Sequence, residues 1–181
     1  MKNILFVLIA FITLASCAQE TASKATVKKA TPKNLQSYET AYFASGCFWC
    51  VEEIFESVRG VEEAVSGYAG GDRIKPTYEE VSAGRTKHAE AVKVYYDPKV
   101  VSFETLVDVF FSSHDPSTKN QQGPDRGAQY RSIAFYQNAK EKEIIENGRK
   151  KTVVLAHTHT RIVPLTHYAF VVTPNALYKS I

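Results

Sequence analysis

The sequence is poor in cysteine, methionine and tryptophan. Its 181 residues include three cysteines, one methionine and one tryptophan. Three cysteines are too few for the disulfide framework of a small secreted domain. Two of them, Cys47 and Cys50, lie three residues apart, which is a spacing typical of redox chemistry or of a local disulfide. This pair alone does not make a structural zinc site, because such a site has four ligands.

The chain also has little net charge. The formal charge is +3, and much of the lysine precedes the first segment with a globular pattern. We therefore predict no nucleic-acid binding. The content of 44% hydrophobic and 23% charged residues is typical of a globular protein, and the length fits one domain.

The only long hydrophobic run lies at the N-terminus, from Ile4 to Ala15. A transmembrane helix needs about 20 apolar residues, so this run is typical of a signal peptide instead. The residues Leu14-Ala15-Ser16-Cys17 resemble a bacterial lipobox, which predicts a lipoprotein signal peptide over 1–17 with Cys17 lipidated. The alternative is an ordinary signal peptide with a chance cysteine. The lipobox predicts a protein of the cell envelope, anchored to a membrane and facing the periplasm or exterior. The polar residues 18–38 are expected to form a flexible linker.

The hydrophobic periodicity from residue 39 onward predicts alternating strands and helices. Strands are expected at 41–44, 89–96 and 130–136, and a further strand within 61–71 that runs into a Gly-rich loop. Helices are expected at 46–58 with Ser45 as N-cap, at 76–84, at 103–111 and, capped by Asn138, to about 150. A long loop is expected at 114–129. This alternation predicts an α/β (α+β) fold: a two-layer ferredoxin-like sandwich with a central mixed sheet and flanking helices.

The cluster Gly46-Cys47-Phe48-Trp49-Cys50 is the strongest chemical signal. A cysteine in the first turn of a helix lies near unpaired N–H groups and the positive end of the helix dipole, which should lower its pKa. The two aromatic residues that follow Cys47 are expected to form the walls of a small apolar pocket. The alternative is that both belong to the core and that Cys47 is an inert buried thiol.

The cluster GCFWC closely resembles the active-site motif of the A-type peptide methionine sulfoxide reductases. The resemblance continues in the same order through GYAGG (67–71), PTYEEVSAG (76–84), HAEAV (88–92), YDP (96–98) and GPDRGAQYRS (123–132). It implies a monomeric enzyme that reduces the S epimer of methionine sulfoxide, in oxidised proteins and as the free amino acid, and so repairs oxidative damage. It also implies that no cofactor is used, since electrons come from thioredoxin or another thiol donor.

The resemblance further implies the roles of single residues. Cys47 is the expected nucleophile and Glu90 the expected acid, because a sulfoxide oxygen leaves only when a strong thiolate attacks and a proton is donated. Burial of Glu90 would raise its pKa and keep it protonated. The other implied site residues are Tyr78 and Tyr130 for the substrate oxygen, Asp125 in support, and Phe48 and Trp49 for the S-methyl group.

The attack leaves Cys47 as a sulfenic acid that must be reduced. Cys50 lies one helical turn away, and the chain has no cysteine near its C-terminus. We therefore predict either a Cys47–Cys50 disulfide or direct reduction by an external thiol.

The resemblance ends near residue 146, and only Ile162 to Leu165 is similar to an expected strand. We therefore assign 39–150 to the catalytic domain and 151–181 to a divergent C-terminal tail, which is either a frameshift or a true divergence. His157 and His159 would share one face of a strand, but without further ligands we predict no metal site. Two alternatives stay open: a thioredoxin-like disulfide oxidoreductase, from the CxxC pair alone, and a catalytically impaired lipoprotein of the same fold.

Overall fold

A computed structural model describes residues 34–152, 158–166 and 170–173. The predicted signal peptide with Cys17, residues 18–33 of the predicted linker, and His157 lie outside the described residues. Among the residues that are described, none of the helices is long and apolar enough to cross a bilayer.

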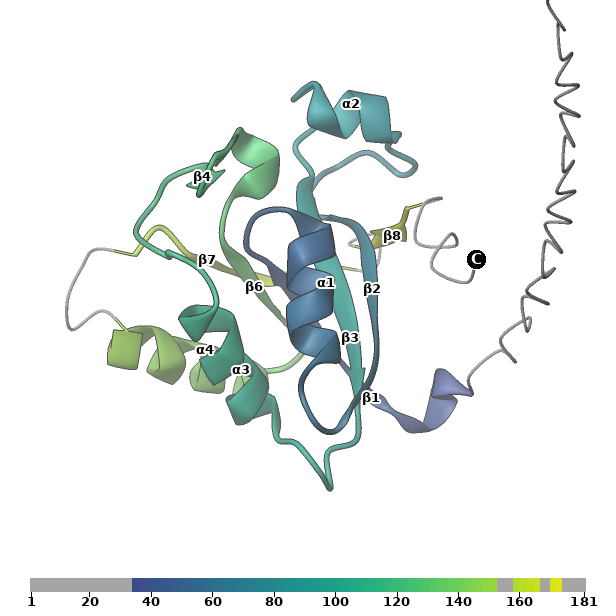
Figure 1. The fold of residues 1–181 in the computed structure, drawn as a ribbon, viewed down its shortest axis with the longest axis vertical. Coiled ribbons are helices and arrows are strands. Elements are labelled where there is room, and N and C mark those ends of the chain that lie inside the picture. Colours follow the sequence, from purple (N-terminus) through teal and green to yellow (C-terminus); the bar gives the residue numbers. More distant parts are fainter. Residues whose placement is uncertain (1–33, 153–157, 167–169, 174–181) are drawn as a thin grey trace, which may run out of the picture.

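The described chain forms a mixed sheet with helices packed against it (Figure 1). In chain order the elements are η1 (Leu35–Ser37), β1 (Glu39–Ala44), α1 (Phe48–Glu56), β2 (Val61–Ala69), α2 (Tyr78–Ser82), β3 (Ala89–Tyr96), α3 (Phe103–Ser112), β4 (Gln121–Gln122), β5 (Asp125–Arg126), η2 (Ala128–Tyr130), β6 (Ile133–Tyr136), α4 (Ala139–Thr152), β7 (Arg161–Pro164) and β8 (Val171–Val172).

The strand order confirms the predicted fold class. The main sheet has the order β7-β6-β1-β3-β2-β8, and its pairs are antiparallel except for the parallel pair β6–β7. Helix α1 connects β1 to β2 and α3 lies between β3 and β6, while β3 lies between β1 and β2 in the sheet. This is the split β-α-β arrangement of a ferredoxin-like sandwich.

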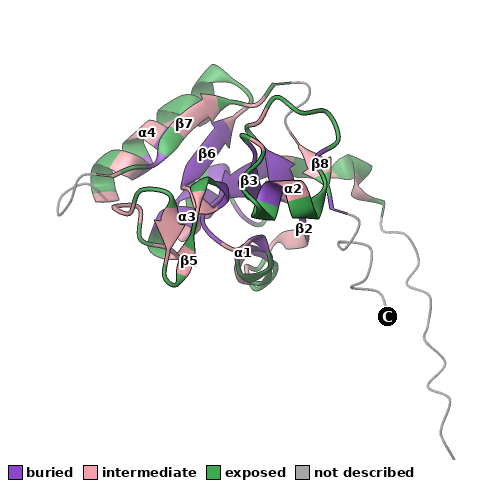
Figure 2. Cartoon of the chain, turned by 90° about the horizontal axis from the view of Figure 1, so that it is seen from above, coloured by how far each residue is buried: buried purple, intermediate pink, exposed green. Residues whose placement is uncertain are grey.

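One face of the sheet packs against α1, α3 and α4, and this interface holds the main core. Phe43 of β1 stacks on Phe55 of α1 and on Phe110 of α3, each with ring centroids 5.0 Å apart. Alternate residues of a strand point to one face, and a helix with apolar residues three and four apart presents one stripe, so these patterns meet. Figure 2 shows the result, with buried strands and outward helix surfaces exposed.

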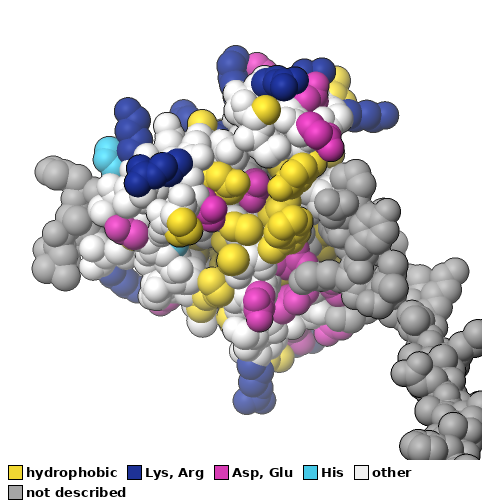
Figure 3. Space-filling view, turned by 45° about the horizontal axis from the view of Figure 1, so that its top comes forward, with side chains coloured by type: hydrophobic (Ala, Val, Ile, Leu, Met, Phe, Trp, Pro, Cys, Tyr) yellow, Lys and Arg dark blue, Asp and Glu magenta, His cyan; other side chains and the backbone are white. Residues whose placement is uncertain are grey.

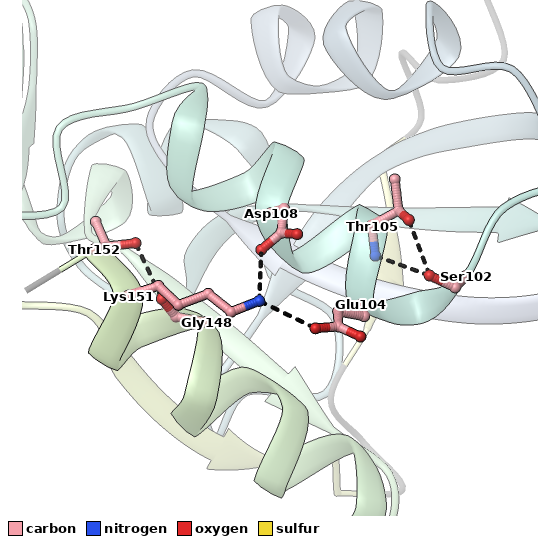
Figure 4. A network of polar contacts seen from close by, with 7 residues as sticks. All are labelled: Ser102, Glu104, Thr105, Asp108, Gly148, Lys151 and Thr152. Atoms are coloured by element: carbon pink, nitrogen blue, oxygen red, sulfur yellow. Dashed lines mark hydrogen bonds and ion pairs between the residues drawn. The ribbon is translucent and has the colours of Figure 1, made fainter.

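Helices α3 and α4 approach each other closely at Gly148. A Cβ atom at this position would lie 2.6 Å from Val107 Cγ1, which is too close for any side chain. Lys151 of α4 also forms ion pairs with Glu104 at 3.1 Å and Asp108 at 3.9 Å of α3 (Figure 4). Because all three side chains are largely exposed, these pairs add little stability. The close packing at Gly148 therefore positions the two helices.

Part of the segment that the sequence assigned to a divergent tail belongs to the sheet. Strand β7 extends the sheet beside β6, and β8 pairs with the end of β2. Phe170 contacts Tyr42 edge-to-face at 5.6 Å on the face away from the helices. The sheet therefore continues past the predicted domain boundary at residue 150, while 174–181 lie outside the described residues.

An arginine beside β7 has no carboxylate partner among the described residues. The Arg131 guanidinium donates to the backbone carbonyls of Lys87, His88 and Ala128 at 2.8, 3.2 and 2.6 Å. Burial and then the nearby charge of Arg161 lower the pKa of Arg131 to about 10. Its Nε atom is buried without a hydrogen-bond partner among the described residues. Two like charges thus lie close together where an ion pair would be favourable.

We expect Arg161→Glu to raise the free energy of unfolding by about 1 kcal/mol, because it replaces a repulsion with a charge-assisted hydrogen bond. Urea unfolding measures this difference. Arg161→Gln is the matched control, since it removes the repulsion without adding a partner and should stabilise less. Equal stabilities of the two variants would show that the glutamate does not reach Arg131.

Candidate active site

The residues of the predicted site gather at one end of the sheet. Strands β1 and β2 end there, β3 and β6 begin there, and α1 begins there with its N-terminus over the sheet (Figure 1). The antiparallel pairing brings these strand ends together, because the end of one strand lies beside the beginning of its neighbour. Figure 3 brings this end of the molecule forward and shows hydrophobic side chains gathered with acidic side chains among and beside them.

Cys47 is the N-cap residue of α1, and the helix begins at Phe48. The prediction of Ser45 as N-cap was therefore wrong. The physical reason is the turn at Gly46, whose φ of 103° reverses the chain between Ser45 and the helix. A side chain at Gly46 would also lie 2.8 Å from Gln122 Cβ, so the turn requires glycine. The turn places Cys47 in the position that a serine cap usually takes.

The acidity of the Cys47 thiol differs from the prediction. Burial is the largest influence and raises the pKa of Cys47, while hydrogen bonds from the backbone N–H groups of Cys50 and Trp49 lower it. Charges on Cys50 and Glu90 add to the increase. The helix N-terminus acts in the predicted direction, but the net pKa is raised because burial outweighs it. The thiol is therefore less acidic than its position at the helix N-terminus predicts.

Glu90 is the predicted acid. It lies near the start of β3, is 3% exposed, and accepts a hydrogen bond at Oε2 from the backbone N–H of Phe48 at 3.1 Å. Burial raises the pKa of Glu90 to about 7, the Phe48 bond lowers it, and the charge of Asp125 raises it. The raised pKa agrees with the prediction from the sequence. A carboxyl that is protonated near neutral pH therefore lies next to the backbone of the thiol.

Aromatic side chains form one side of the site. Phe48 is fully buried, with its ring 5.3 Å from Trp49 and 5.8 Å from Tyr68. Trp49 is 47% exposed and stacks on Tyr78, the first residue of α2, at 6.4 Å. Phe48 thus forms a buried wall, and the Trp49–Tyr78 stack forms an exposed rim that is open to a substrate.

The loop before β6 supplies the opposite side. Tyr130 ends η2, and burial followed by the charges of Glu90 and Asp125 raises the pKa of its phenol. Asp125 lies in β5, paired with Gln122 of β4. The predicted loop at 114–129 thus folds back as a short hairpin. The seven residues predicted as catalytic or substrate-binding come together at this end: Cys47, Phe48, Trp49, Tyr78, Glu90, Asp125 and Tyr130.

Two more residues, Cys50 and Tyr68, lie beside these seven. Cys50 is exposed in the same helical turn as Cys47, and both are free thiols. Tyr68 of the GYAGG motif is 1% exposed and contacts Phe48, yet sequence reasoning gave it no role. Within the described ranges, no group of three or more His, Cys, Asp or Glu side chains could hold a metal ion.

Comparison with known families decides which chemistry this arrangement serves. A family model described as peptide methionine sulfoxide reductase matches residues 39–171. The chain belongs to this family. The match extends past residue 146, where the motif resemblance ended, because it includes β7 and the start of β8. It also sets aside the thioredoxin-like oxidoreductase alternative, which rested on the CxxC pair alone.

Individual members of the peptide methionine sulfoxide reductase family support the assignment. The chain is 49% identical over 137 residues to MsrA of Methanosarcina acetivorans, covering 74% of this chain and 73% of that protein. For MsrA of Methanosarcina mazei the identity is 45% over 141 residues, covering 74% of this chain and 65% of that protein. The alignments therefore leave about a quarter to a third of each relative unmatched.

Solved structures share the fold. Methionine sulfoxide reductase A of Corynebacterium diphtheriae has a TM-score of 0.69 and 32% identity, covering 86% of this chain and 80% of that one. Mxr1 of Saccharomyces cerevisiae in reduced form has a TM-score of 0.66 and 31% identity, covering 79% and 84%. Mxr1 has also been solved in complex with Trx2. The identity between this chain and that structure is 23%, so the comparison supports the fold alone.

Proposed function

We propose that the chain reduces the S epimer of methionine sulfoxide, in proteins and as the free amino acid, with Cys47 as nucleophile and Glu90 as acid. The observation that carries this proposal is the bond from Phe48 N–H to Glu90 Oε2, which fixes a carboxyl of pKa about 7 beside the thiol. Thiolate and acid are the two groups that displacement at a sulfoxide requires. The family assignment supplies the substrate class.

The first step transfers oxygen from substrate to enzyme. The Cys47 thiolate attacks the sulfoxide sulfur while Glu90 gives its proton to the sulfoxide oxygen. A bond between the two sulfur atoms forms, and the hydroxyl then moves to the Cys47 sulfur as the sulfur–sulfur bond and the sulfur–oxygen bond of the substrate break. Methionine is released, Cys47 becomes a sulfenic acid and Glu90 becomes a carboxylate. Cys47 is oxidised and the substrate sulfur is reduced, and the one proton that the pair held ends on the sulfenic acid oxygen.

The surrounding side chains orient the substrate. The phenols of Tyr78 and Tyr130 donate hydrogen bonds to the sulfoxide oxygen, and Asp125 supports the site from β5. The rings of Phe48 and Trp49 hold the S-methyl group. The phenol of Tyr130 lies within electrostatic reach of both Glu90 and Tyr78, so the two phenols and the acid belong to the same end of the site.

Cys50 resolves the sulfenic acid. Its exposed thiol attacks the Cys47 sulfur, a disulfide forms and water leaves. Its position one turn into α1, with its own backbone N–H directed at the Cys47 sulfur, supports this assignment. A thioredoxin-type protein then reduces the disulfide, as the Mxr1–Trx2 complex suggests by analogy. No cofactor is needed, since both electrons come from thiols.

The decisive experiment is an assay on separated S and R epimers of a methionine sulfoxide peptide, with dithiothreitol as reductant. Turnover of the S epimer alone supports the proposal. Binding of the sulfoxide peptide by a folded protein without turnover would instead favour the catalytically impaired lipoprotein.

Cys50→Ser is expected to leave the first turnover unchanged and to slow thioredoxin-supported cycling by at least about tenfold, because the sulfenic acid then has no internal partner. Mass spectrometry after one equivalent of sulfoxide should find a Cys47–Cys50 disulfide in the natural chain and a dimedone-reactive sulfenic acid in the variant. Undiminished cycling of the variant would assign the reduction to an external thiol directly.

We also propose that the signal peptide is cleaved before Cys17, and that lipid on Cys17 anchors a monomer to an envelope membrane through the linker at 18–38. The apolar run and lipobox at the N-terminus support this proposal. Membrane fractionation of the natural chain and of Cys17→Ala tests it, since only the natural chain should resist extraction with salt.

A further inference from the structure

Tyr68 stands directly beside the proposed acid. It lies in β2, and Glu90 is its opposite partner in the antiparallel pair with β3. Side chains at opposite positions project to the same face of a sheet, with Cβ atoms about 5 Å apart. The phenol of Tyr68 and the carboxyl of Glu90 therefore lie side by side under the beginning of α1, where Phe48 covers the phenol ring.

The two groups have complementary hydrogen-bonding capacity. The Tyr68 hydroxyl is fully buried and has no hydrogen-bond partner among the described residues. In that same part of the chain, Glu90 accepts one hydrogen bond, at Oε2 from Phe48 N–H. A buried hydroxyl without a partner is costly, and in a native protein it calls for an explanation. The neighbouring Glu90 carboxyl offers a partner, because its second oxygen can accept a hydrogen bond and because its charge changes in the proposed reaction.

We propose that Tyr68 is a positioning residue whose hydroxyl donates a hydrogen bond to the Glu90 carboxylate once this acid has given its proton to the sulfoxide oxygen. The inference rests on the proposed function. Before the transfer the carboxyl is neutral and one donor is sufficient. After the transfer a buried anion exists, and hydrogen bonds to the charged form stabilise it.

Tyr68 itself gives up no proton in this scheme. Burial is the first cause that raises the pKa of Tyr68, followed by the charge of Glu90 and by Tyr78 and Glu79 of α2. The phenol therefore stays protonated throughout, as a donor must. Substrate turnover gains because the anion left on Glu90 is stabilised at the moment it forms.

Other groups also face Glu90 and must be held constant in a test. Helix α1 contributes Cys47 and the Phe48 N–H group, β5 contributes the charge of Asp125, and η2 contributes the phenol of Tyr130. Two buried hydroxyls lack a partner in the described chain, those of Ser45 and Tyr68, and of these only Tyr68 lies opposite Glu90 in the sheet. Its replacement by phenylalanine removes that hydroxyl and leaves the ring against Phe48.

The test is the titration of Glu90 in Tyr68→Phe, followed by 13C NMR of the labelled carboxyl and by the pH profile of kcat/KM with an S-sulfoxide peptide. We expect the pKa of Glu90 to rise by about one unit, since its charged form loses a donor. The matched control is Tyr96→Phe, which removes another buried hydroxyl, bonded to Glu39 at 2.9 Å, and should leave the Glu90 titration unchanged.

A second measurement needs no variant. In the natural chain the 13Cζ resonance of Tyr68 should shift with pH at the same midpoint as the Glu90 carboxyl. An unchanged or lowered pKa of Glu90 in Tyr68→Phe, or a Tyr68 resonance that does not follow Glu90, overturns the inference. Absence of sulfoxide turnover in the natural chain would instead overturn the proposed function, because both NMR titrations are read without substrate.

Discussion

Cys47→Ser is expected to abolish sulfoxide reduction, with a loss of at least roughly 10⁴-fold in kcat/KM for an S-sulfoxide peptide. Serine is nearly the same size, so the Gly46 turn and the start of α1 should persist. Its hydroxyl does not ionise in the accessible pH range, and a neutral hydroxyl is a far weaker nucleophile than a thiolate at sulfur. Single-turnover release of methionine, followed by chromatography, measures the loss directly.

Cys50→Ser is the matched control for this variant, because it removes a thiol from the same helical turn but keeps the nucleophile. It should release one equivalent of methionine at the natural rate. Equal first-turnover rates in all three proteins would show that neither thiol attacks the substrate and would overturn the assignment of Cys47.

Glu90→Gln is expected to lower kcat/KM by roughly 10²- to 10⁴-fold, the usual effect of losing a positioned general acid. The amide is of similar shape, and its oxygen can still accept the hydrogen bond from Phe48 N–H. The variant therefore removes the proton donor with little change in the backbone around Cys47. Steady-state kinetics on the S epimer measure the effect.

The pH profile distinguishes loss of the acid from a merely structural effect. Burial raises the pKa of Glu90 to about 7 and also raises the pKa of Cys47 above its ordinary value, so the carboxyl ionises first. The productive form holds one proton on the pair, and that form is populated between the two apparent pKa values. Thus kcat/KM of the natural enzyme should rise through about pH 7 and fall at alkaline pH.

In Glu90→Gln the rise near neutral pH should disappear, and the remaining rate should increase only as the Cys47 thiol ionises. The pKa of that thiol should also fall toward its ordinary value, because the charge of Glu90 is one of the causes that raise it. If kcat/KM of the variant still rises near neutral pH, another group is the acid. Asp125 would then be the next residue to replace.

The C-terminal segment illustrates how far sequence motifs extend. The family motifs become hard to follow after residue 146, yet residues 161–164 pair in parallel with β6 and 171–172 pair with β2. Strand pairing depends on backbone hydrogen bonds and on apolar residues at alternate positions, and both survive large changes in sequence. The position of Arg161 beside Arg131, by contrast, is a local defect that only the packed structure reveals.

The sequence by itself determined the order of the longer strands and helices from β1 to α4 and the residue types of the site. These features are local, because neighbouring residues determine turns, the apolar stripes of helices and the motif blocks. The motif blocks also identified Cys47, Glu90, Tyr78 and Tyr130, which the fold then brings to one end of the sheet.

Only the tertiary structure decided how these groups behave. The pKa of Cys47 is raised although its helix position predicts a fall, because burial depends on elements distant in the sequence. Tyr68 became a candidate only when the register of β2 and β3 placed it opposite Glu90. Register, burial and the charges that meet across a sheet are long-range properties, so they belong to the folded chain and not to any single motif.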